Sequence, residues 1–574
     1  MNKKSAAWQQ YPRPQLKRDG YMILNGEWEL DGKSIQVPFA PQSQLSGFEG
    51  EVGDNLVYKK KFHLPESFTK ELVLLHFGAV DQICEVHLNG ETVGAHKGGY
   101  LPFTIDITKQ VSHTEENLLE VYVTDTLSEV YPYGKQCKKR GGMWYTPVSG
   151  IWQTVWMENV SKEYISKVTL TPDMEGVDVQ IVPAGDILSK AEIVIELENG
   201  EEIRQEISGD FSGRISLADH VCKDGTKYRP VLWTPEVPHL YRAKIYYGED
   251  CVETYFALRT VSVENKAGVN RVCLNGNPIF MHGVLDQGYY QDGIYLPKEE
   301  EEFERDILRM KSLGYNMLRK HIKVEPECFY YYCDMHGMLV VQDMVNNGHY
   351  DFLTQTLAPT FGVKKWSDMG GLYFKERRAT KGDPQWERKA FWGEHAKETI
   401  AHLYNHPCIV AYTIFNEAWG QFDSDRFYEE LKQLDSTRLY DSTSGWFAQK
   451  KSDFDSEHIY FRSKDLKPGI RPLFLSECGG FSLAIEGHRF TEKTYGYGAC
   501  KSREELTERI MGMYDKMVLP AIEKGLCGCV YTQLSDVEDE INGLYTYDRE
   551  ICKVVEAPFL QLKEEIEKRI GNGR

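Results

Sequence analysis

The pattern of apolar residues changes halfway along this chain of 574 residues. Up to about residue 260, short runs alternate apolar and polar side chains and end in turn residues. Residues 82–90 alternate in this way and close in Asn89-Gly90, a strong hairpin signal. After about residue 275, strand-like apolar runs alternate with stretches of helical period, such as Phe303, Ile307 and Met310. Residues 387–403 and 504–524 are two further stretches predicted to be helical. The sequence therefore predicts β-domains followed by an α/β domain.

The alternating runs fall into two sets. The first set ends near residue 160 and predicts a β-sandwich. The second set has roughly seven short strands and predicts an immunoglobulin-like sandwich over residues 161–263. Residues 264–574 alternate strands and helices over about 310 positions, which fits one (β/α)8 TIM barrel of typically ~250 residues or more. We therefore expect three domains, with boundaries near residues 160 and 263.

Charge and composition exclude several classes of partner. The net charge of −19 repels phosphate backbones and anionic membranes. No stretch reaches the ~18–20 apolar residues of a membrane-spanning helix, and the basic N-terminus has no apolar signal segment after it. The 13 cysteines are scattered and odd in number, which fits reduced thiols. We expect a cytoplasmic protein that binds neither nucleic acid nor membranes.

Two glutamates stand where barrel enzymes carry their chemistry, directly after apolar strands. Glu417 follows the strand 409–415 with Asn416 between them, and Glu477 follows the strand 471–476. We assign these strands as the fourth and seventh of the barrel, with short units between them. Two carboxyls on one barrel mouth suit glycosidic hydrolysis, which needs one protonated acid and one ionised nucleophile. Burial and mutual repulsion separate their pKa values. The alternative is two ordinary strand-end acids, and the flanking residues weigh against it.

Those flanking residues resemble glycoside hydrolase family 2, which includes β-galactosidases, β-glucuronidases and β-mannosidases. Asn405-His406-Pro407-Cys408 before the fourth strand and Asn416-Glu417-Ala418-Trp419-Gly420 after it resemble the acid/base signature of the family. Residues 11–16, 24–28 and 144–156 resemble the family as well, so the resemblance spans nearly the whole chain. It implies a jelly-roll sugar-binding-like domain, then an immunoglobulin-like domain, then the barrel.

The resemblance also implies roles for single residues. Glu417 is expected to be the general acid/base and Glu477 the nucleophile of a retaining mechanism. Asn416 is expected to bind the sugar 2-hydroxyl, a contact that strengthens in the transition state. His458 and Tyr460 resemble the tyrosine site of the sixth strand. Both are expected to contact the substrate, and Tyr460 is expected to touch the nucleophile.

Further polar residues at strand ends are candidates for sugar contacts. Arg319 and His321 resemble an Arg-x-x-His neighbourhood with one residue fewer; we expect Arg319 to hold Glu477 ionised and His321 to bind a hydroxyl. Asp286 and Asp343 follow the first and third strands and are expected to bind hydroxyls. A purely structural ion pair at the barrel mouth is an equally open reading of these four residues. For Trp446, as for Trp419, a stacking platform and a core position are both open.

Departures from the family pattern limit which cofactors are expected for this protein. Glu477 lies in Ser-Glu-Cys-Gly-Gly, whereas many members have an aromatic residue after the glutamate. The His-Glu-His metal cluster of large β-galactosidases is replaced by Val284-Leu285-Asp286-Gln287. We therefore expect neither a metal nor another cofactor.

The same comparison with the family pattern limits which kind of sugar we expect the site to accept. Glucuronidases grip the sugar carboxylate with Asn-x-Lys, where this chain has Glu540-Ile541-Asn542. An acid there repels a uronate, so a neutral sugar is expected, with galactose first. A β-glucuronidase or β-galacturonidase is the alternative, and its anion contacts would come from the basic loop Lys135, Lys138, Lys139 and Arg140.

A third hypothesis is a non-catalytic carbohydrate-binding protein with a degenerate barrel, against which the intact glutamate pair argues. The expected partner is a small glycoside or oligosaccharide. Family members often form homo-oligomers, and the sequence leaves that question open.

Overall fold

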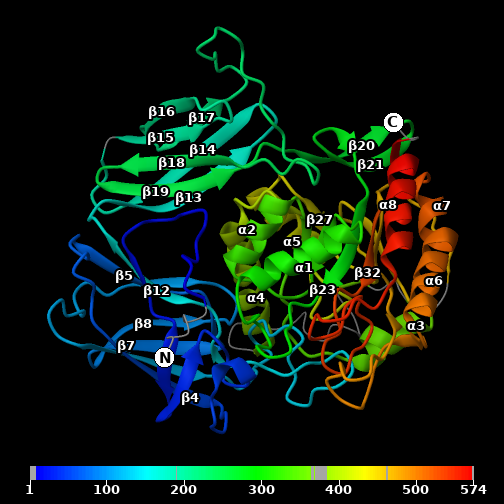
Figure 1. Cartoon of the computed structure of the whole chain (residues 1–574), viewed down its shortest axis with the longest axis horizontal. Coiled ribbons are helices and arrows are strands. Elements are labelled where there is room, and N and C mark those ends of the chain that lie inside the picture. The colour runs from blue at the N-terminus through cyan, green and yellow to red at the C-terminus, as the bar shows by residue number, and fades with distance from the viewer. Residues whose placement is uncertain (1–7, 189, 364–366, 369–383, 461–462, 572–574) are drawn as a thin grey trace.

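The computed structural model describes residues 8–188, 190–363, 367–368, 384–460 and 463–571. Residues 21–160 form two antiparallel sheets packed face to face around Trp28, Val86 and Phe77 (Figure 1). One sheet has the order β1 (Tyr21–Ile23), β12 (Val155–Val160), β5 (Leu72–Phe77), β9 (Phe103–Asp106). The other has the order β3 (Lys33–Val37), β2 (Gly26–Leu30), β4 (Asn55–Phe62), β10 (Asn117–Thr124), β7 (Ile83–Leu88), β8 (Glu91–Lys97).

A second sandwich follows, and its seven strands agree with the predicted number. Alternate residues such as Ile193 and Ile245 fill its core, as the period of two requires. Its sheets have the orders β13 (Tyr164–Pro172), β14 (Gly176–Ala184), β17 (Ser212–Ser216) and β16 (Glu202–Ser208), β15 (Lys190–Glu196), β18 (Tyr241–Tyr247), β19 (Asp250–Phe256). The hairpin strands β20 (Val261–Lys266), β21 (Val269–Leu274) and β22 (Asn277–Pro278) lead to the barrel.

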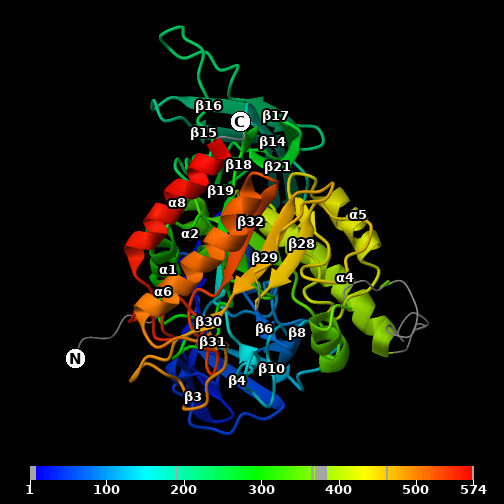
Figure 2. The same ribbon diagram turned by 90° about the vertical axis from the view of Figure 1, so that its right-hand side faces the viewer.

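The last part is an eight-stranded parallel sheet in barrel order, surrounded by helices (Figure 2). In chain order the strands are β23 (Met281–Asp286), β24 (Met317–Lys320), β25 (Leu339–Asp343), β26 (Ile409–Thr413), β27 (Leu439–Asp441), β28 (Asp455–Ile459), β29 (Leu473–Gly479) and β32 (Leu526–Thr532). Each strand pairs with its neighbours in the order, and β32 pairs with β23. Only β27 and β28, which stand at the two ends of the order, do not pair with each other. The predicted jelly-roll, immunoglobulin-like and TIM-barrel architecture is confirmed at the level of these sheets.

The helices of the barrel lie close to the predicted positions. They are α1 (Glu301–Ser312), α2 (Glu327–His336), α4 (Pro384–Leu403), α5 (Ser424–Leu434), α6 (Arg503–Met513), α7 (Leu519–Ile522) and α8 (Glu556–Gly571). The helix predicted over 504–524 is interrupted by a π-helical turn, Tyr514–Val518, just before Pro520. Proline lacks the amide N–H of a regular helix, which accounts for the irregular turn. None of the described helices is long and apolar enough to cross a membrane.

The first sandwich shares a hydrophobic core with the barrel. Tyr100 and Trp152 of the sandwich pack with Tyr295 of the barrel segment, and the Tyr100 and Tyr295 hydroxyls lie 2.7 Å apart. This contact brings the sandwich loop of residues 133–146 to the barrel mouth. The predicted boundary at residue 263 falls inside β20, and the domain limits stay predictions.

Candidate active site

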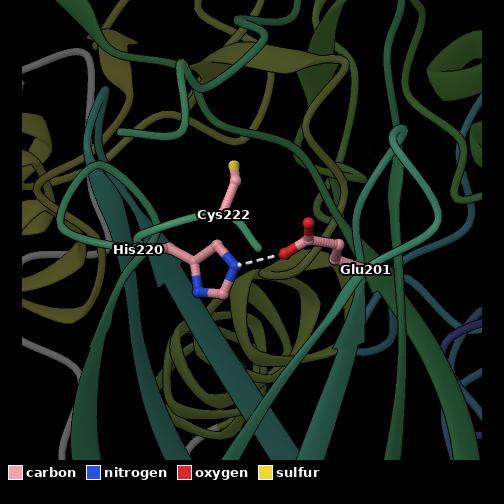
Figure 3. A group of neighbouring side chains, drawn as sticks. All are labelled: Glu201, His220 and Cys222. Carbon is pink, nitrogen blue, oxygen red and sulfur yellow. Dashed lines mark hydrogen bonds and ion pairs between the residues drawn. The ribbon is translucent and has the colours of Figure 1, made fainter. Parts of the chain in front are cut away.

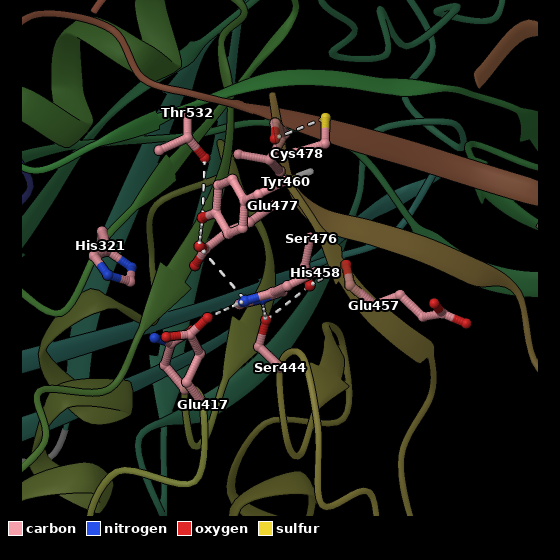
Figure 4. Close-up of polar contacts among 12 residues, drawn as sticks. His321, Glu417, Ser444, Glu457, His458, Tyr460, Ser476, Glu477, Cys478 and Thr532 are labelled. Carbon is pink, nitrogen blue, oxygen red and sulfur yellow. Dashed lines mark hydrogen bonds and ion pairs between the residues drawn. The ribbon is translucent and has the colours of Figure 1, made fainter. Parts of the chain in front are cut away.

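The structure brings the two predicted catalytic carboxylates together. Glu417 follows β26, the fourth strand, and Glu477 lies in β29, the seventh strand. Oxygens of both carboxylates and a ring nitrogen of His458 all lie within 4.8 Å of one another (Figure 4). Parallel strands of one barrel end at the same face, which is why residues 60 positions apart meet there.

The backbone at Glu417 adopts an uncommon conformation. Glu417 and Ala418 have φ angles of 49° and 61°, in the left-handed region that non-glycine residues rarely use. Backbone hydrogen bonds hold this turn, from Glu417 N to Ser444 O at 2.9 Å and from Trp419 N to Asn416 O at 2.9 Å. Strain of this kind is found mostly at functional positions.

Glu477 is buried among groups that favour its ionised form. Arg319 donates to Glu477 Oε1 at 3.0 Å, and the Tyr460 hydroxyl donates to Oε2. Burial raises the pKa of Glu477, but His458, Arg319 and His321 outweigh burial and, with the Tyr460 bond, lower that pKa to about 2. The side chain is therefore a carboxylate at neutral pH.

Arg319 is fully buried and organises this end of the barrel. It donates to Asp343 Oδ1 at 3.0 Å and to Asn416 Oδ1 at 2.8 Å, as well as to Glu477. Because the amide oxygen of Asn416 accepts from Arg319, the Asn416 NH2 group is the part left to face a ligand. The predicted ion pair between Arg319 and Glu477 is thus present in the structure.

His321 and Asp343 form one pair. His321 Nδ1 lies 2.8 Å from Asp343 Oδ2, so both Asp343 oxygens are used by Arg319 and His321. Burial lowers the pKa of His321, which favours the neutral ring. Burial raises the pKa of Asp343, but Arg319 and His321 outweigh it and lower that pKa. Asp343 supports its neighbours, whereas His321 keeps Nε2 for a ligand.

Asp286 does not join this group in the contacts of the described residues. Its oxygens accept from Lys320 Nζ at 2.5 Å and from Gly288 N at 2.9 Å. Lys320 and Lys323 both pair with the buried Glu325 at 2.8 Å. The Asp286 carboxylate is therefore part of a neighbouring ionic network, which corresponds to the structural alternative for this residue.

The aromatic candidates lie in the walls of the site. Trp446 packs its ring against His458, with centroids 5.5 Å apart and planes at 70°. Trp419 is buried and donates from Nε1 to Gly348 O at 3.0 Å. Trp144, from the first sandwich, packs edge-on against Trp419 at 4.9 Å. The structure thus places Trp419 in the packed wall, and Trp144 joins it there, a contact that sequence reasoning missed.

The basic loop of the first sandwich reaches the barrel, and its positively charged side chains have different partners. Arg140 pairs with Asp539 at 3.0 Å, and Lys138 pairs with Asp54 at 3.6 Å. The positive charge of Lys135 instead acts on His321 and on Glu540, which places this half-buried lysine beside the site.

Glu540 lies buried where the loop and the barrel meet. The Tyr145 hydroxyl donates to one Glu540 oxygen, and Asn542 Nδ2 donates to the other at 2.9 Å. Burial raises the pKa of Glu540 above its ordinary value despite these donors and Lys135. The charge of Glu477 also acts on Glu540, so the two acids border the same region. Tyr145 belongs to the 144–156 stretch that carried the resemblance, but its contact depends on domain packing.

Two groups of metal-ligating side chain types lie elsewhere among the described residues. One joins Glu201, His220 and Cys222 on loops of the second sandwich, where His220 Nε2 lies 3.2 Å from Glu201 Oε2 (Figure 3). The other joins His488, Asp548 and Glu550, and of these three side chains Glu550 is exposed. The expectation of a metal-free protein stays a prediction.

Comparison with known proteins identifies the family. Residues 23–158 match the sugar binding domain, and residues 263–465 the TIM barrel domain, of the glycosyl hydrolases family 2. A β-galactosidase of Thermoanaerobacter pseudethanolicus is 25% identical over 391 residues, which cover 66% of this chain and 46% of that protein. A putative β-glucuronidase of Formosa agariphila is 26% identical over 441 residues, covering 73% of this chain and 38% of that protein. The chain therefore spans less than half the length of these relatives.

Solved structures share the whole fold. A β-D-glucuronidase of Dictyoglomus thermophilum superposes with a TM-score of 0.72 at 20% identity, covering 97% of this chain and 98% of that chain. A β-glucuronidase of Ruminococcus gnavus has a TM-score of 0.73 at 16% identity, covering 98% of this chain and 100% of that chain. From its sequence motifs, its matched domains and its three-part fold, this chain belongs to glycoside hydrolase family 2.

Proposed function

We propose that this protein is a retaining exo-β-glycosidase, with Glu417 as the general acid/base and Glu477 as the nucleophile. The observation that carries the proposal is the carboxylate pair itself, with oxygens within 4.8 Å of each other. Retaining glycosidases hold their carboxyl groups about 5–5.5 Å apart, whereas inverting enzymes need about 6.5–9.5 Å to admit a water molecule.

The contacts of Glu417 and Glu477 support a role for each residue in the two steps of the reaction. Protonated Glu417 gives its proton to the glycosidic oxygen while Glu477, ionised beside Arg319, attacks the anomeric carbon. The bond to the leaving oxygen breaks and the aglycone departs as an alcohol. Glu417 then takes a proton from water, whose oxygen attacks the same carbon and releases Glu477. The NH2 group of Asn416 is the donor proposed for the sugar 2-hydroxyl.

Tyr460 supports the nucleophile, and its removal gives a first test. In Tyr460→Phe, kcat/KM should fall about 10- to 100-fold, because a hydrogen bond to a charged group contributes about 1.5–3 kcal/mol. Losing this donor raises the pKa of Glu477, so the acid limb of kcat/KM should move to higher pH. Tyr428→Phe, which removes a hydroxyl bonded to Asp453 at 2.8 Å, is the matched control. Equal kcat/KM values in both variants would contradict the assignment.

For the sugar, we propose a neutral β-glycoside, with β-galactosides first. The supporting observation is Glu540, whose buried carboxyl group borders the region of Glu477. A uronate carboxylate placed there would face a second acid. The β-uronide alternative is supported by Lys135 beside Glu540, and solved structures of similar fold are β-glucuronidases. A carbohydrate-binding protein without activity is disfavoured, because Glu417 and Glu477 both keep catalytic surroundings.

A pair of substrates that differ only at C6 tests the sugar. The aryl β-galactoside should exceed the aryl β-galacturonide in kcat/KM by about tenfold or more, equivalent to about 1.4 kcal/mol of repulsion. Glu540→Gln should narrow this ratio because it removes the acid. A wider panel adds the glucoside, glucuronide, mannoside and α-arabinoside. Preference for uronides, lost in Lys135→Met, would establish the alternative, and binding without turnover on all substrates would favour the binding protein.

A further inference from the structure

Both ring nitrogens of His458 are already engaged within the protein. Nδ1 lies 2.7 Å from Glu417 Oε1 and 3.5 Å from Glu477 Oε2, and Nε2 lies 2.8 Å from Ser444 Oγ. The side chain is 0% exposed. Since Glu477 is ionised and a carboxyl group keeps an accepting oxygen even when it is protonated, Nδ1 carries the proton that faces the two acids. His458, expected from the sequence to contact the substrate, has no nitrogen left for a sugar hydroxyl.

The ring is held in this place. A Cβ atom on Gly445 would lie 2.9 Å from His458 Nδ1, and Gly445 has a φ of 95°. Only glycine allows the turn after β27 to pass this close to the ring. Trp446 then packs its ring against the imidazole. The position of Nδ1 between the two carboxylates is therefore fixed by packing.

A line of hydroxyl groups runs from His458 Nε2 toward a buried acid. Ser444 Oγ lies 2.8 Å from Ser476 Oγ (Figure 4), which lies 2.6 Å from Ser456 Oγ. The Ser456 hydroxyl in turn acts on the side chain of Asp441, which is 1% exposed. Burial raises the pKa of Asp441 to about 6. Because a hydroxyl both donates and accepts, the chain can point every donor from Nε2 toward Asp441, which suits a positively charged ring.

In the proposed reaction the negative charge passes from Glu477 to Glu417, and His458 Nδ1 lies near both. Before the first step, Glu477 is the carboxylate and Glu417 is protonated. In the glycosyl-enzyme, Glu477 is an ester and Glu417 is the carboxylate, because its proton has left with the aglycone. Nδ1 lies within reach of both acids, so the ring faces one carboxylate in each state.

We propose that His458 is a positioning residue. Its positive charge stabilises the negative charge first on Glu477 and then on Glu417, and the chain Ser444, Ser476, Ser456 and Asp441 stabilises the positive charge of His458. This inference rests on the proposed glycosidase function. It assigns a role to a hydrogen-bond chain whose serines come from three successive strands or their ends, β27, β28 and β29.

Other charged and titratable groups lie near His458. Around it lie Glu417 after β26, Glu477 on β29, Asp441 on β27, and Tyr460, whose hydroxyl binds Glu477. Arg319 on β24 pairs with Glu477 and with Asp343 on β25. Glu457, next to His458, pairs instead with Lys464 at 2.5 Å. Neutralising His458 therefore removes a cation that Glu417, Glu477 and Asp441 share.

The test is the pH dependence of kcat and kcat/KM in His458→Gln, on the aryl glycoside that the wild-type protein hydrolyses best. Without the cation both glutamates favour their protonated forms, so both limbs of the profile should move to higher pH, by about one unit. The kcat for a dinitrophenyl glycoside, limited by release of the glycosyl-enzyme, should fall about tenfold. A role only in packing would lower activity and leave both limbs in place, which would overturn the proposal.

A second variant keeps the test valid if His458→Gln does not fold. Ser456→Ala breaks the hydroxyl chain at its half-buried end and should shift both limbs in the same direction by a smaller amount. Ser452→Ala is the matched control, because among the described residues Ser452 Oγ bonds only the backbone of Ser442, Phe454 and Tyr440. Identical profiles for Ser456→Ala and Ser452→Ala would overturn the role of the chain. A wild-type protein inactive on every glycoside would instead refute the proposed function.

Discussion

Replacing Glu477 by glycine should abolish hydrolysis of every glycoside, with kcat/KM reduced by roughly 10⁴-fold or more, since no covalent intermediate can form. Even an activated dinitrophenyl leaving group should not restore turnover, because the missing group is the nucleophile rather than the acid. The fold should tolerate the change, because Arg319 keeps Asp343 and Asn416 as partners. Steady-state hydrolysis of the aryl glycoside panel measures the loss.

Added azide separates a lost nucleophile from a damaged site. In Glu477→Gly, azide can enter the space left by the carboxylate and attack the anomeric carbon of an activated β-glycoside, displacing its leaving group. The product should be the α-glycosyl azide, which NMR identifies by its anomeric coupling. Glu457→Gln, on the neighbouring strand β28, is the matched control and should keep wild-type turnover. Unchanged hydrolysis in Glu477→Gly would refute the nucleophile assignment.

Replacing Glu417 by glutamine should produce a different pattern, which depends on the leaving group. Alkyl and phenyl glycosides, whose leaving oxygen needs a proton, should lose about 10²–10⁴-fold in kcat/KM. A dinitrophenyl glycoside needs no proton to leave, so its kcat/KM should change little. Its kcat should fall, because water now attacks the glycosyl-enzyme without a general base. The measurement is kcat/KM across a series of aryl leaving groups of increasing pKa.

Azide also distinguishes this variant. In Glu417→Ala, azide should attack the glycosyl-enzyme on the face left by the aglycone and yield the β-glycosyl azide, with an increase in kcat. The opposite anomers from the two variants identify the two roles independently of rates. Equal losses for good and poor leaving groups would show that Glu417 is not the general acid.

The local patterns of the sequence were sufficient for the fold and for the positions of the two glutamates. Strands β26 and β29 are continuous apolar runs, and such runs predict buried parallel strands without knowledge of the neighbours. The strand β27 has only three residues, Leu439–Asp441, and was not predicted, because pairing with β26 rather than its own pattern stabilises it. Asp441 ends this strand and Ser444 comes just after it, so the sequence also did not predict these two members of the hydroxyl chain to His458.

The contacts of side chains required the tertiary structure. Asp286 ends β23 and Glu477 lies near the end of β29, but Asp286 is neutralised by Lys320, whereas Glu477 faces Arg319 across the barrel. Which neighbour a strand-end acid meets depends on the residues of adjacent strands, and the spacing along the chain does not encode this.

The sequence by itself determined that Glu417 and Glu477 stand at the ends of two barrel strands and that their flanks belong to one family, because strand ends and motifs are local properties of the chain. Only the tertiary structure decided that Lys135 and Tyr145 of the first sandwich border Glu540, and that His458 lies between the two carboxylates. These contacts arise from packing one domain against another and one strand against the next, and their free energies depend on residues hundreds of positions apart.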